Sequence, residues 1–157
     1  MRATLDTFIV EKDLSAIYIT STIPSQSIKN VLTILEVDLK RIHFVDCISH
    51  IMMGAAVRAE HVHFVESPTM LENIMLKVEF LMRSIDGKKL VLLDSINSLA
   101  IHNNTKILSE FLHIMVNNLR AKDAYTLILS VEEQSSEEIN NMLGLVCDES
   151  LILTEGK

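Results

Sequence analysis

The sequence predicts an α/β fold in which helices cover both faces of a mostly parallel sheet, giving three layers. Three observations lead to this prediction. Short runs rich in Ile, Leu and Val alternate with longer segments in which apolar residues recur at helical spacing. Two of the runs, residues 90–93 and 125–131, are almost entirely apolar, which is typical of strands buried on both faces of a parallel sheet. Hydrophobic residues form 48% of the chain but aromatic residues only 4%, which favours aliphatic layers over an aromatic-rich β-sandwich.

The length and charge of the chain limit the domain organisations and the kinds of partner that are expected. A chain of 157 residues is long enough for one domain with a sizeable core, and no repeat or linker divides it, so we predict a single domain over residues 1–157. The net charge is −7 and the basic residues are scattered, which argues against nucleic acid as a partner. No apolar run approaches the length of a membrane span, and the N-terminus has no signal-peptide pattern. Cys47 and Cys147 lack CxxC spacing, so we expect reduced thiols in a cytoplasmic protein that does not contact a membrane.

The first third of the chain is predicted to form two helices and two strands. Thr4 is placed to cap a short apolar helix. Residues 16–20 (AIYIT) are predicted to be a strand, because β-branched and aromatic residues follow one another there. Pro24 can begin the next helix, whose apolar stripe includes Val31. Residues 42–45 are predicted to form a second, short strand.

The middle of the chain contains one ambiguous segment and the clearest helix. Residues 49–60 fit either a helix or a loop, and residues 62–65 fit a short strand. Thr69 and Glu72 have capping-box spacing in front of a long apolar stripe, which predicts the start of a helix. Gly87 is well placed to end that helix.

The second half begins with the stretch around which we expect the sheet to form. Residues 90–98 (LVLLDSINS) predict a buried strand with Asp94 at its end, which is where ligands bind in open α/β sheets. A second long helix follows, and after it comes the apolar strand 125–131. Ser135 has capping-box spacing to the glutamate three residues later, before a short helix. Residues 150–153 are predicted to form a closing strand.

In their order and spacing, these segments resemble the core of RecA-like ATPases, and in particular the KaiC-type branch. Residues 17–20 (IYIT) resemble the strand that follows the P-loop helix. LVLLDSINSL resembles the Walker B strand, which places Asp94 at the position that normally helps to hold the magnesium ion. The strand 125–131 and the ending VCDESLIL resemble later strands of that family. The resemblance covers nearly the whole chain and implies a three-layer α/β sandwich with a mostly parallel RecA-like sheet.

The motif that binds nucleotide phosphates in that family does not occur in this sequence. A P-loop needs GxxxxGK[ST], because a glycine-rich backbone wraps the phosphates while lysine meets their charge. None of the four glycines stands in such a motif. The N-terminus resembles the end of a P-loop, with Arg2 in place of the lysine and Ala3 in place of the magnesium-binding hydroxyl. The resemblance therefore implies Asp94, Ser95, Arg2 and Thr4 as candidate nucleotide-binding residues, left over from the Walker motifs.

The catalytic carboxylate of the family is absent as well. KaiC-like ATPases carry acidic residues just after the strand that residues 17–20 match, whereas this chain has Ser21 and Thr22 there. A hydroxyl does not serve as a general base near neutral pH without help. With neither the phosphate cradle nor the base, we expect a degenerate domain that has no catalytic residues, does not hydrolyse ATP and requires no cofactor.

Each candidate residue also has a plainer structural interpretation. Asp94 is more simply a residue that caps a turn or a helix start at the end of its strand. His61 and His63 alternate and would share one face of a strand, but a zinc site needs a further ligand, so we predict no metal site. Cys47 is interpreted as a small buried residue. Met52 stands in the ambiguous segment, where an exposed apolar patch would indicate a partner surface.

From these observations we predict a non-catalytic domain that acts as a protein-interaction or regulatory module, through a protein partner or through self-association. If the P-loop strand is absent, its neighbours in the sheet must close up, pair with another chain or expose unpaired backbone groups. Two alternatives remain open. One is a KaiC-like ATPase whose P-loop lies upstream of the assigned start. The other is weak binding of ATP and magnesium without hydrolysis.

Overall fold

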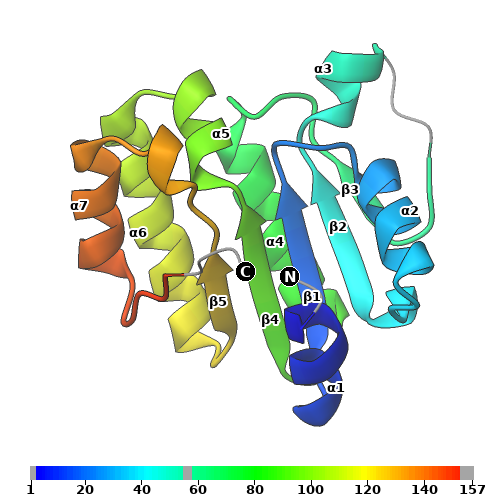
Figure 1. Ribbon diagram of the computed structural model, residues 1–157. Coiled ribbons are helices and arrows are strands. Elements are labelled where there is room, and N and C mark those ends of the chain that lie inside the picture. The colour runs from blue at the N-terminus through cyan, green and yellow to red at the C-terminus, as the bar shows by residue number, and fades with distance from the viewer. Residues whose placement is uncertain (1–2, 55–57, 153–157) are drawn as a thin grey trace.

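The computed structural model describes residues 3–54 and 58–152 of the chain. Its centre is a sheet of five parallel strands in the order β3-β2-β1-β4-β5 (Figure 1). The strands are β1 (Ser15–Thr20), β2 (Ile42–Asp46), β3 (Val62–Phe64), β4 (Lys89–Asp94) and β5 (Tyr125–Ile128). The predicted α/β class with a parallel sheet is therefore confirmed.

Helices cover both faces of this sheet and produce the predicted layers (Figure 1). One face carries α4 (Leu71–Ser84), α5 (Ile96–His102), α6 (Thr105–Ala121) and α7 (Glu137–Val146). The other face carries the π-helix η1 (Ala3–Phe8), α1 (Ile9–Glu11) and α2 (Ser25–Ile34). The connections contain the short helices η2 (Leu39–Arg41), α3 (Ser49–Met53) and η3 (Glu132–Gln134). None of the helices in the described ranges is long and apolar enough to cross a membrane.

The alternation of side chains along β1 divides the hydrophobic core between the two faces of the sheet. Ile17 and Ile19 belong to the apolar cluster beneath α4 and α6, whereas Ala16 and Tyr18 belong to the cluster beneath α1 and α2. Because helices cover both faces, nearly every residue of the central strands β1 and β4 is buried. This double burial accounts for the uninterrupted apolar runs in the sequence.

The register of the central strands brings their carboxyl ends together. Thr20, the last residue of β1, lies beside Asp46 at the end of β2 and beside Asp94 at the end of β4. Ligands of open α/β sheets bind outside the carboxyl ends of the strands. This edge of the sheet is therefore the first place to look for a functional site.

The predicted helix caps differ from the observed ones. α4 begins after Met70 without a side-chain cap, because the backbone N–H of Thr69 donates to Ser67 Oγ in the preceding turn. The capping box predicted at Thr69 is therefore wrong. α7 is capped by the hydroxyl of Ser136, one residue after the predicted Ser135. Before α4 the neighbouring Ser67 hydroxyl takes the backbone donor of Thr69, and at α7 the helix starts one residue later than predicted.

Other elements differ from their predictions at single positions. α4 ends at Ser84, so Gly87 does not end it but lies in the turn before β4, with a φ of 81°. Val31 is 55% exposed and faces solvent rather than the core. The ambiguous segment begins with α3 and continues to Gly54, whose φ of 73° suits glycine. Residues 55–57 of that segment lie outside the described part of the chain.

The predicted closing strand is wrong for residues 150–152. They pair with no strand in the structure, and Leu151 and Ile152 are each 80% exposed. Leu153, the last residue of the prediction, lies outside the described residues. Strand propensity alone does not make a strand, because a strand also needs backbone hydrogen bonds to a neighbour, and among the described strands β5 pairs only with β4.

Candidate functional site

The structure brings together only part of the predicted nucleotide site. Asp94 ends β4, and Ser95 directly follows it at the carboxyl edge of the sheet. Thr4 has its backbone in η1, but its side chain is not among the described atoms. Arg2 lies outside the described residues. The geometry of the candidate site is therefore that of Asp94, Ser95 and the residues around them.

The Asp94 carboxylate is held by a buried tyrosine. The hydroxyl of Tyr18, on the neighbouring strand β1, donates to Asp94 Oδ2 at 2.7 Å. Tyr18 is fully buried, and its pKa is raised well above the ordinary value by burial, by the hydrogen bond to Asp94 and by the negative charge of that residue. The tyrosine therefore stays protonated and keeps donating. The interpretation of Asp94 as a helix cap is wrong, because its side chain bonds across the sheet.

Ser95 is the residue that caps the helix after β4. Its hydroxyl accepts the backbone N–H of Ser98 at 3.3 Å, which starts α5. The loop after β1 is fastened to the same place. Ser21 Oγ donates to the carbonyl oxygen of Ser95 at 3.2 Å, and Ser98 Oγ donates to the carbonyl oxygen of Ser21. The hydroxyl of Thr22 lies 3.5 Å from Ser95 Oγ. These bonds join the loops after β1 and β4 into one unit.

Asp46 is a second carboxylate at this edge, and no motif in the sequence singles it out. It is fully buried at the end of β2. Its Oδ2 accepts the backbone N–H of Ser25, at the start of α2, at 2.8 Å. Its Oδ1 accepts the N–H groups of Ile48 and Ser49 at 3.0 and 2.9 Å, and the hydroxyl of Ser49 donates to Oδ2. The spacing from Asp46 to Ser49 was a usable local signal, but nothing in the sequence marks the contact with Ser25.

The balance of burial and hydrogen bonding keeps Asp46 ionised. Burial alone would raise its pKa, but the hydrogen bonds from Ser25 and Ser49 outweigh that effect and lower it below the ordinary value. A carboxylate whose oxygens are occupied by protein donors is poorly placed to bind a metal ion. Asp46 therefore acts as an anchor that joins the starts of α2 and α3 to the sheet.

Asn97 is a further buried polar residue at this edge, and nothing in the sequence indicates its contacts. It is 3% exposed, and its Oδ1 accepts the backbone N–H of Val131 at 2.6 Å. Its Nδ2 donates to Ser135 Oγ at 2.9 Å and to the carbonyl oxygen of Val131 at 3.4 Å. Asn97 thus ties α5 to the loop that follows β5. Its partners are 34 and 38 positions away, so no local pattern could have indicated the contact.

The described residues contain no cluster of three or more His, Cys, Asp or Glu side chains that could hold a metal ion. Cys47 follows Asp46 and is fully buried, as predicted. Burial, reinforced by the charge of Asp46, raises the pKa of its thiol, so the reactive thiolate is disfavoured. At this edge, Asp46, Asp94, Ser95 and Asn97 each bond to a neighbouring protein group. The described arrangement is suited to linking segments of the protein to one another.

The histidines form a different arrangement from the predicted one. His61 precedes β3 and has a φ of 58°, so it does not share a strand face with His63. Its ring stacks on that of His43 in β2, with the ring centroids 4.4 Å apart. His63 instead meets the edge of the Phe80 ring on α4.

The histidine stack predicts a loss of stability in mild acid. Burial, followed by the charges of His61 and His63, lowers the pKa of His43 to about 4. Between its ordinary pKa of about 6.5 and this value, the unfolded chain binds a proton that folded His43 does not. We therefore expect the free energy of unfolding to fall as the pH is lowered from 6.5 to 4.

Urea denaturation at a series of pH values measures this effect. His43→Phe, which keeps an aromatic ring beside His61, is expected to flatten the profile in that range. His102→Phe, at an exposed position, is the control and should leave the slope unchanged. An identical slope in wild type and His43→Phe would contradict the assignment.

Comparisons with known proteins place the fold but not the activity. A family model described as "Family of unknown function (DUF7090)" matches residues 2–155. No curated protein matches the chain. The crystal structure of a KaiC-like protein from the hyperthermophilic archaeon Pyrococcus horikoshii superimposes with a TM-score of 0.58 and 13% sequence identity. The match covers 88% of this chain but 58% of the other, so this chain spans little more than half of that protein. At this identity the likeness concerns the fold alone, which is similar to that of this KaiC-like protein.

Proposed function

We propose that this chain, which belongs to the family of unknown function DUF7090, is a non-catalytic KaiC-like domain that works by binding other proteins. The observation that carries the proposal is that polar groups at the carboxyl edge of the sheet form hydrogen bonds to one another. In nucleotide-binding α/β proteins, this edge offers backbone N–H groups and side chains to the ligand. Here Tyr18, Ser21 and Ser98 bond to the groups at the ends of β1 and β4 instead.

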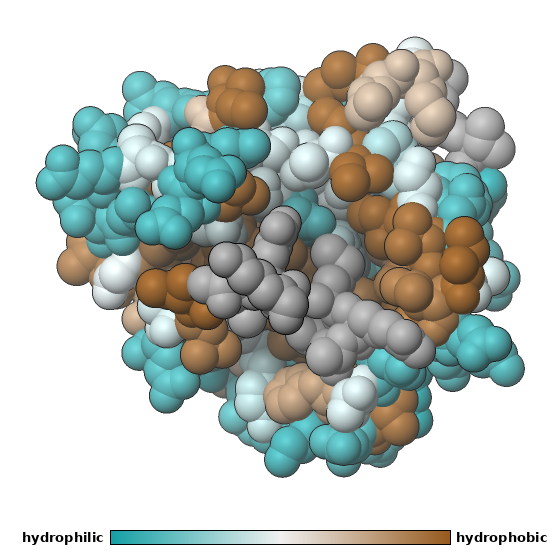
Figure 2. All heavy atoms as spheres, viewed as in Figure 1, coloured by the Kyte–Doolittle hydropathy of each residue, from teal (hydrophilic) through white to brown (hydrophobic). Residues whose placement is uncertain are grey.

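Exposed apolar side chains support protein contacts as the mode of action. On α3, Ile51, Met52 and Met53 are each more than half exposed, and on α2 Val31 and Ile34 are exposed as well. Figure 2 shows brown, hydrophobic side chains gathered over the side of the molecule where these two helices lie. Unbranched methionine side chains adapt to differently shaped partners. Exposed apolar groups gathered in this way favour a protein partner over a small polar substrate.

Weak binding of ATP and magnesium without hydrolysis is the second candidate. It is favoured by Asp94, which stands at the position that resembles the Walker B aspartate and is only half-buried. An exposed carboxylate oxygen can contact a magnesium ion directly or through water. The hydrogen bond from Tyr18 weighs against this candidate, because metal binding would compete with it.

Isothermal titration calorimetry with ATP and magnesium separates the two candidates. We expect wild type to give no heat beyond that of dilution, because the chain offers no described phosphate cradle and Asp94 is already engaged. Saturable heat in wild type that is lost in Asp94→Ala would overturn the proposal in favour of nucleotide binding. Asp38→Ala, which removes an exposed carboxylate at the start of η2, is the control for a general loss of negative charge. Thermal melting of each variant verifies that it is folded.

A further inference from the structure

The outer edge of β5 presents backbone groups that pair with no strand in the described part of the chain. β5 is the last strand of the sheet and pairs only with β4 among the described strands. Just beyond β5, the N–H of Leu129 donates to Leu93 and its carbonyl oxygen accepts from Ile96, so Leu129 faces the β4 side. Because peptide groups alternate along an extended chain, Thr126 and Ile128 direct their N–H and carbonyl groups away from β4. These groups form a template on which another strand can pair.

Nothing in the composition of this edge protects it from strand addition. Proteins usually defend an edge strand with lysine, proline, a bulge or a very short strand. Residues 125–131 (YTLILSV) contain no charged residue and no proline, and they are rich in residues that favour strands. β3, at the opposite edge, has three residues and is preceded by the charged Glu60 and by His61. The two edges of the sheet therefore differ in composition, and the β5 edge carries fewer of the features that protect an edge strand.

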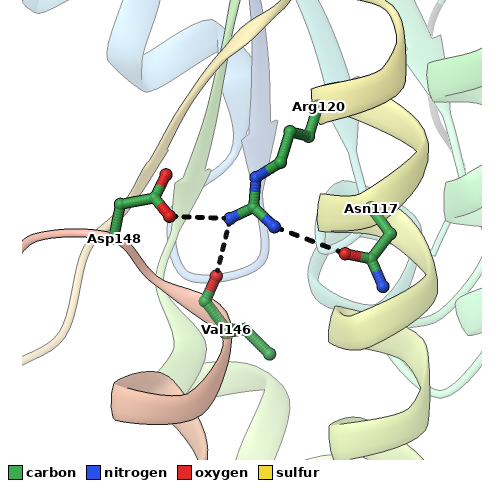
Figure 3. Close-up of polar contacts among 4 residues, drawn as sticks. All are labelled: Asn117, Arg120, Val146 and Asp148. Carbon is green, nitrogen blue, oxygen red and sulfur yellow. Dashed lines mark hydrogen bonds and ion pairs between the residues drawn. The ribbon is translucent and has the colours of Figure 1, made fainter.

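The C-terminal segment begins close to this edge because Arg120 holds it there. Arg120 lies in the last turn of α6, and the chain passes from α6 directly into β5. Its Nη2 donates to Asp148 Oδ1 at 3.0 Å and to the carbonyl oxygen of Val146 at 3.3 Å (Figure 3). Asn117 accepts from the other guanidinium nitrogen at 3.4 Å. The segment that leaves α7 therefore starts beside the amino end of β5.

Residues 149–152 have the properties expected of a strand that pairs with the outer edge of β5. The segment has four residues, as does β5, and it contains the apolar pair Leu151 and Ile152. Both side chains are 80% exposed, although burying a residue of this kind contributes about 1.5–3 kcal/mol. A strand that follows β5 and α7 would enter the sheet parallel to β5 by a right-handed crossover, the usual hand of such connections. The chain therefore carries both an open edge and an exposed segment that fits it.

We propose that residues 149–152 of each copy pair with the β5 edge of a second copy, which gives a dimer that exchanges its C-terminal strands. The single chain leaves its own segment unpaired, so the edge and the segment are both available to another molecule. Reciprocal exchange satisfies both in each copy and closes under two-fold symmetry, so the assembly stops at a dimer. This inference rests on the proposed function as an interaction module and identifies the partner as a second copy.

Two variants separate the edge from the segment. Thr126→Pro removes an N–H that faces outward, so it blocks strand addition while the bonds to β4 remain. Thr126→Val keeps the N–H and a β-branched side chain and serves as its control. Leu151→Asp with Ile152→Asp makes the segment charged. Leu145→Asp places a charge at an equally exposed position on α7, and it is the control for added negative charge.

Light scattering after gel filtration, over about 1 μM to 1 mM protein, measures the mass of each variant without nucleotide. We expect wild type and both controls to form dimers as the concentration rises. Thr126→Pro and the doubly charged variant should each dissociate at least about tenfold more readily. A mixture of these two variants should recover a weaker dimer, because one molecule supplies an intact segment and the other an intact edge. Circular dichroism melts identify any variant that has lost its fold. If Thr126→Pro is unfolded, Ile128→Pro replaces it, both alone and in the mixture.

Three results would overturn the inference. They are a wild type that stays monomeric at the highest concentration, a folded Thr126→Pro that dimerises like wild type, and a mixture that does not associate. The last result would indicate that the edge of one molecule and the segment of another do not pair with each other, and the first would indicate that the segment stays free or pairs within its own chain. Nucleotide binding by calorimetry would overturn the proposed function and leave this measurement unaffected, so the two failures are distinguishable.

Discussion

Asp46→Ala is expected to lower the free energy of unfolding by about 3–5 kcal/mol, more than the loss of any other polar side chain at the carboxyl edge of the sheet. The carboxylate accepts the backbone N–H groups of Ser25, Ile48 and Ser49 in a fully buried position. An unpaired buried donor costs about 1–3 kcal/mol, and alanine leaves three of them without an acceptor. Urea denaturation followed by circular dichroism measures the loss.

Asp38→Ala is the matched control for this substitution. Asp38 also accepts a backbone N–H, that of Lys40 at 3.0 Å, but its side chain is exposed. Water can replace an exposed acceptor, so we expect a loss of about 1 kcal/mol or less. Equal losses for the two substitutions would contradict the view that burial makes Asp46 an anchor.

The depressed pKa of Asp46 also gives its contribution a defined pH dependence. The unfolded carboxyl group takes up its proton at a higher pH than the folded one. The contribution to stability is therefore complete above the ordinary pKa of about 4 and is lost as the pH falls through the folded value. Asp46→Asn, which cannot ionise, should show a flatter decline of stability in this acid range.

Asn97→Ala is expected to lower the free energy of unfolding by about 2–3 kcal/mol. The side-chain amide of Asn97 is almost fully buried. It accepts a hydrogen bond from the N–H of Val131 and donates to the carbonyl oxygen of Val131 and to the hydroxyl of Ser135. Alanine removes these partners and loosens the loop after β5. Hydrogen exchange should therefore show faster opening of residues 129–135 in this variant.

Asn117→Ala provides the comparison for Asn97. Asn117 is an exposed asparagine on α6 whose side chain accepts from Arg120 at 3.4 Å. We expect it to change stability by about 0.5 kcal/mol or less, as at other surface positions. A loss for Asn97→Ala as small as this would mean that water takes over the partners of the buried amide.

The strands were the most predictable part of the fold. Residues 90–93 and 16–20 lie in β4 and β1, and both strands are buried as their apolar runs predicted. Helix positions followed from apolar periodicity, but their first residues did not. Several hydroxyls stand next to one another before α4 and α7, and the choice among them depends on geometry that the spacing does not encode.

The predicted C-terminal strand shows that strand propensity alone is not sufficient to form a strand. Residues 150–152 have the composition of a strand but form none, because a strand also requires backbone hydrogen bonds to a neighbour, and these residues pair with none of the described strands. Tyr125 and the residues after it are a strand because β4 lies beside them. Both segments are rich in aliphatic residues, and the difference between them is that only residues 125–128 are paired with a neighbouring strand.

The sequence by itself determined the α/β class, the apolar strands and the position of Asp94 at the end of β4, because burial between two layers of helices demands these residue types in this order. Only the tertiary structure decided what the polar residues do. Tyr18 lies 76 positions from Asp94, and Asn97 lies 34 positions from Val131. Contacts of this kind depend on strand order and register, which bring distant residues together without leaving a pattern in either stretch of sequence.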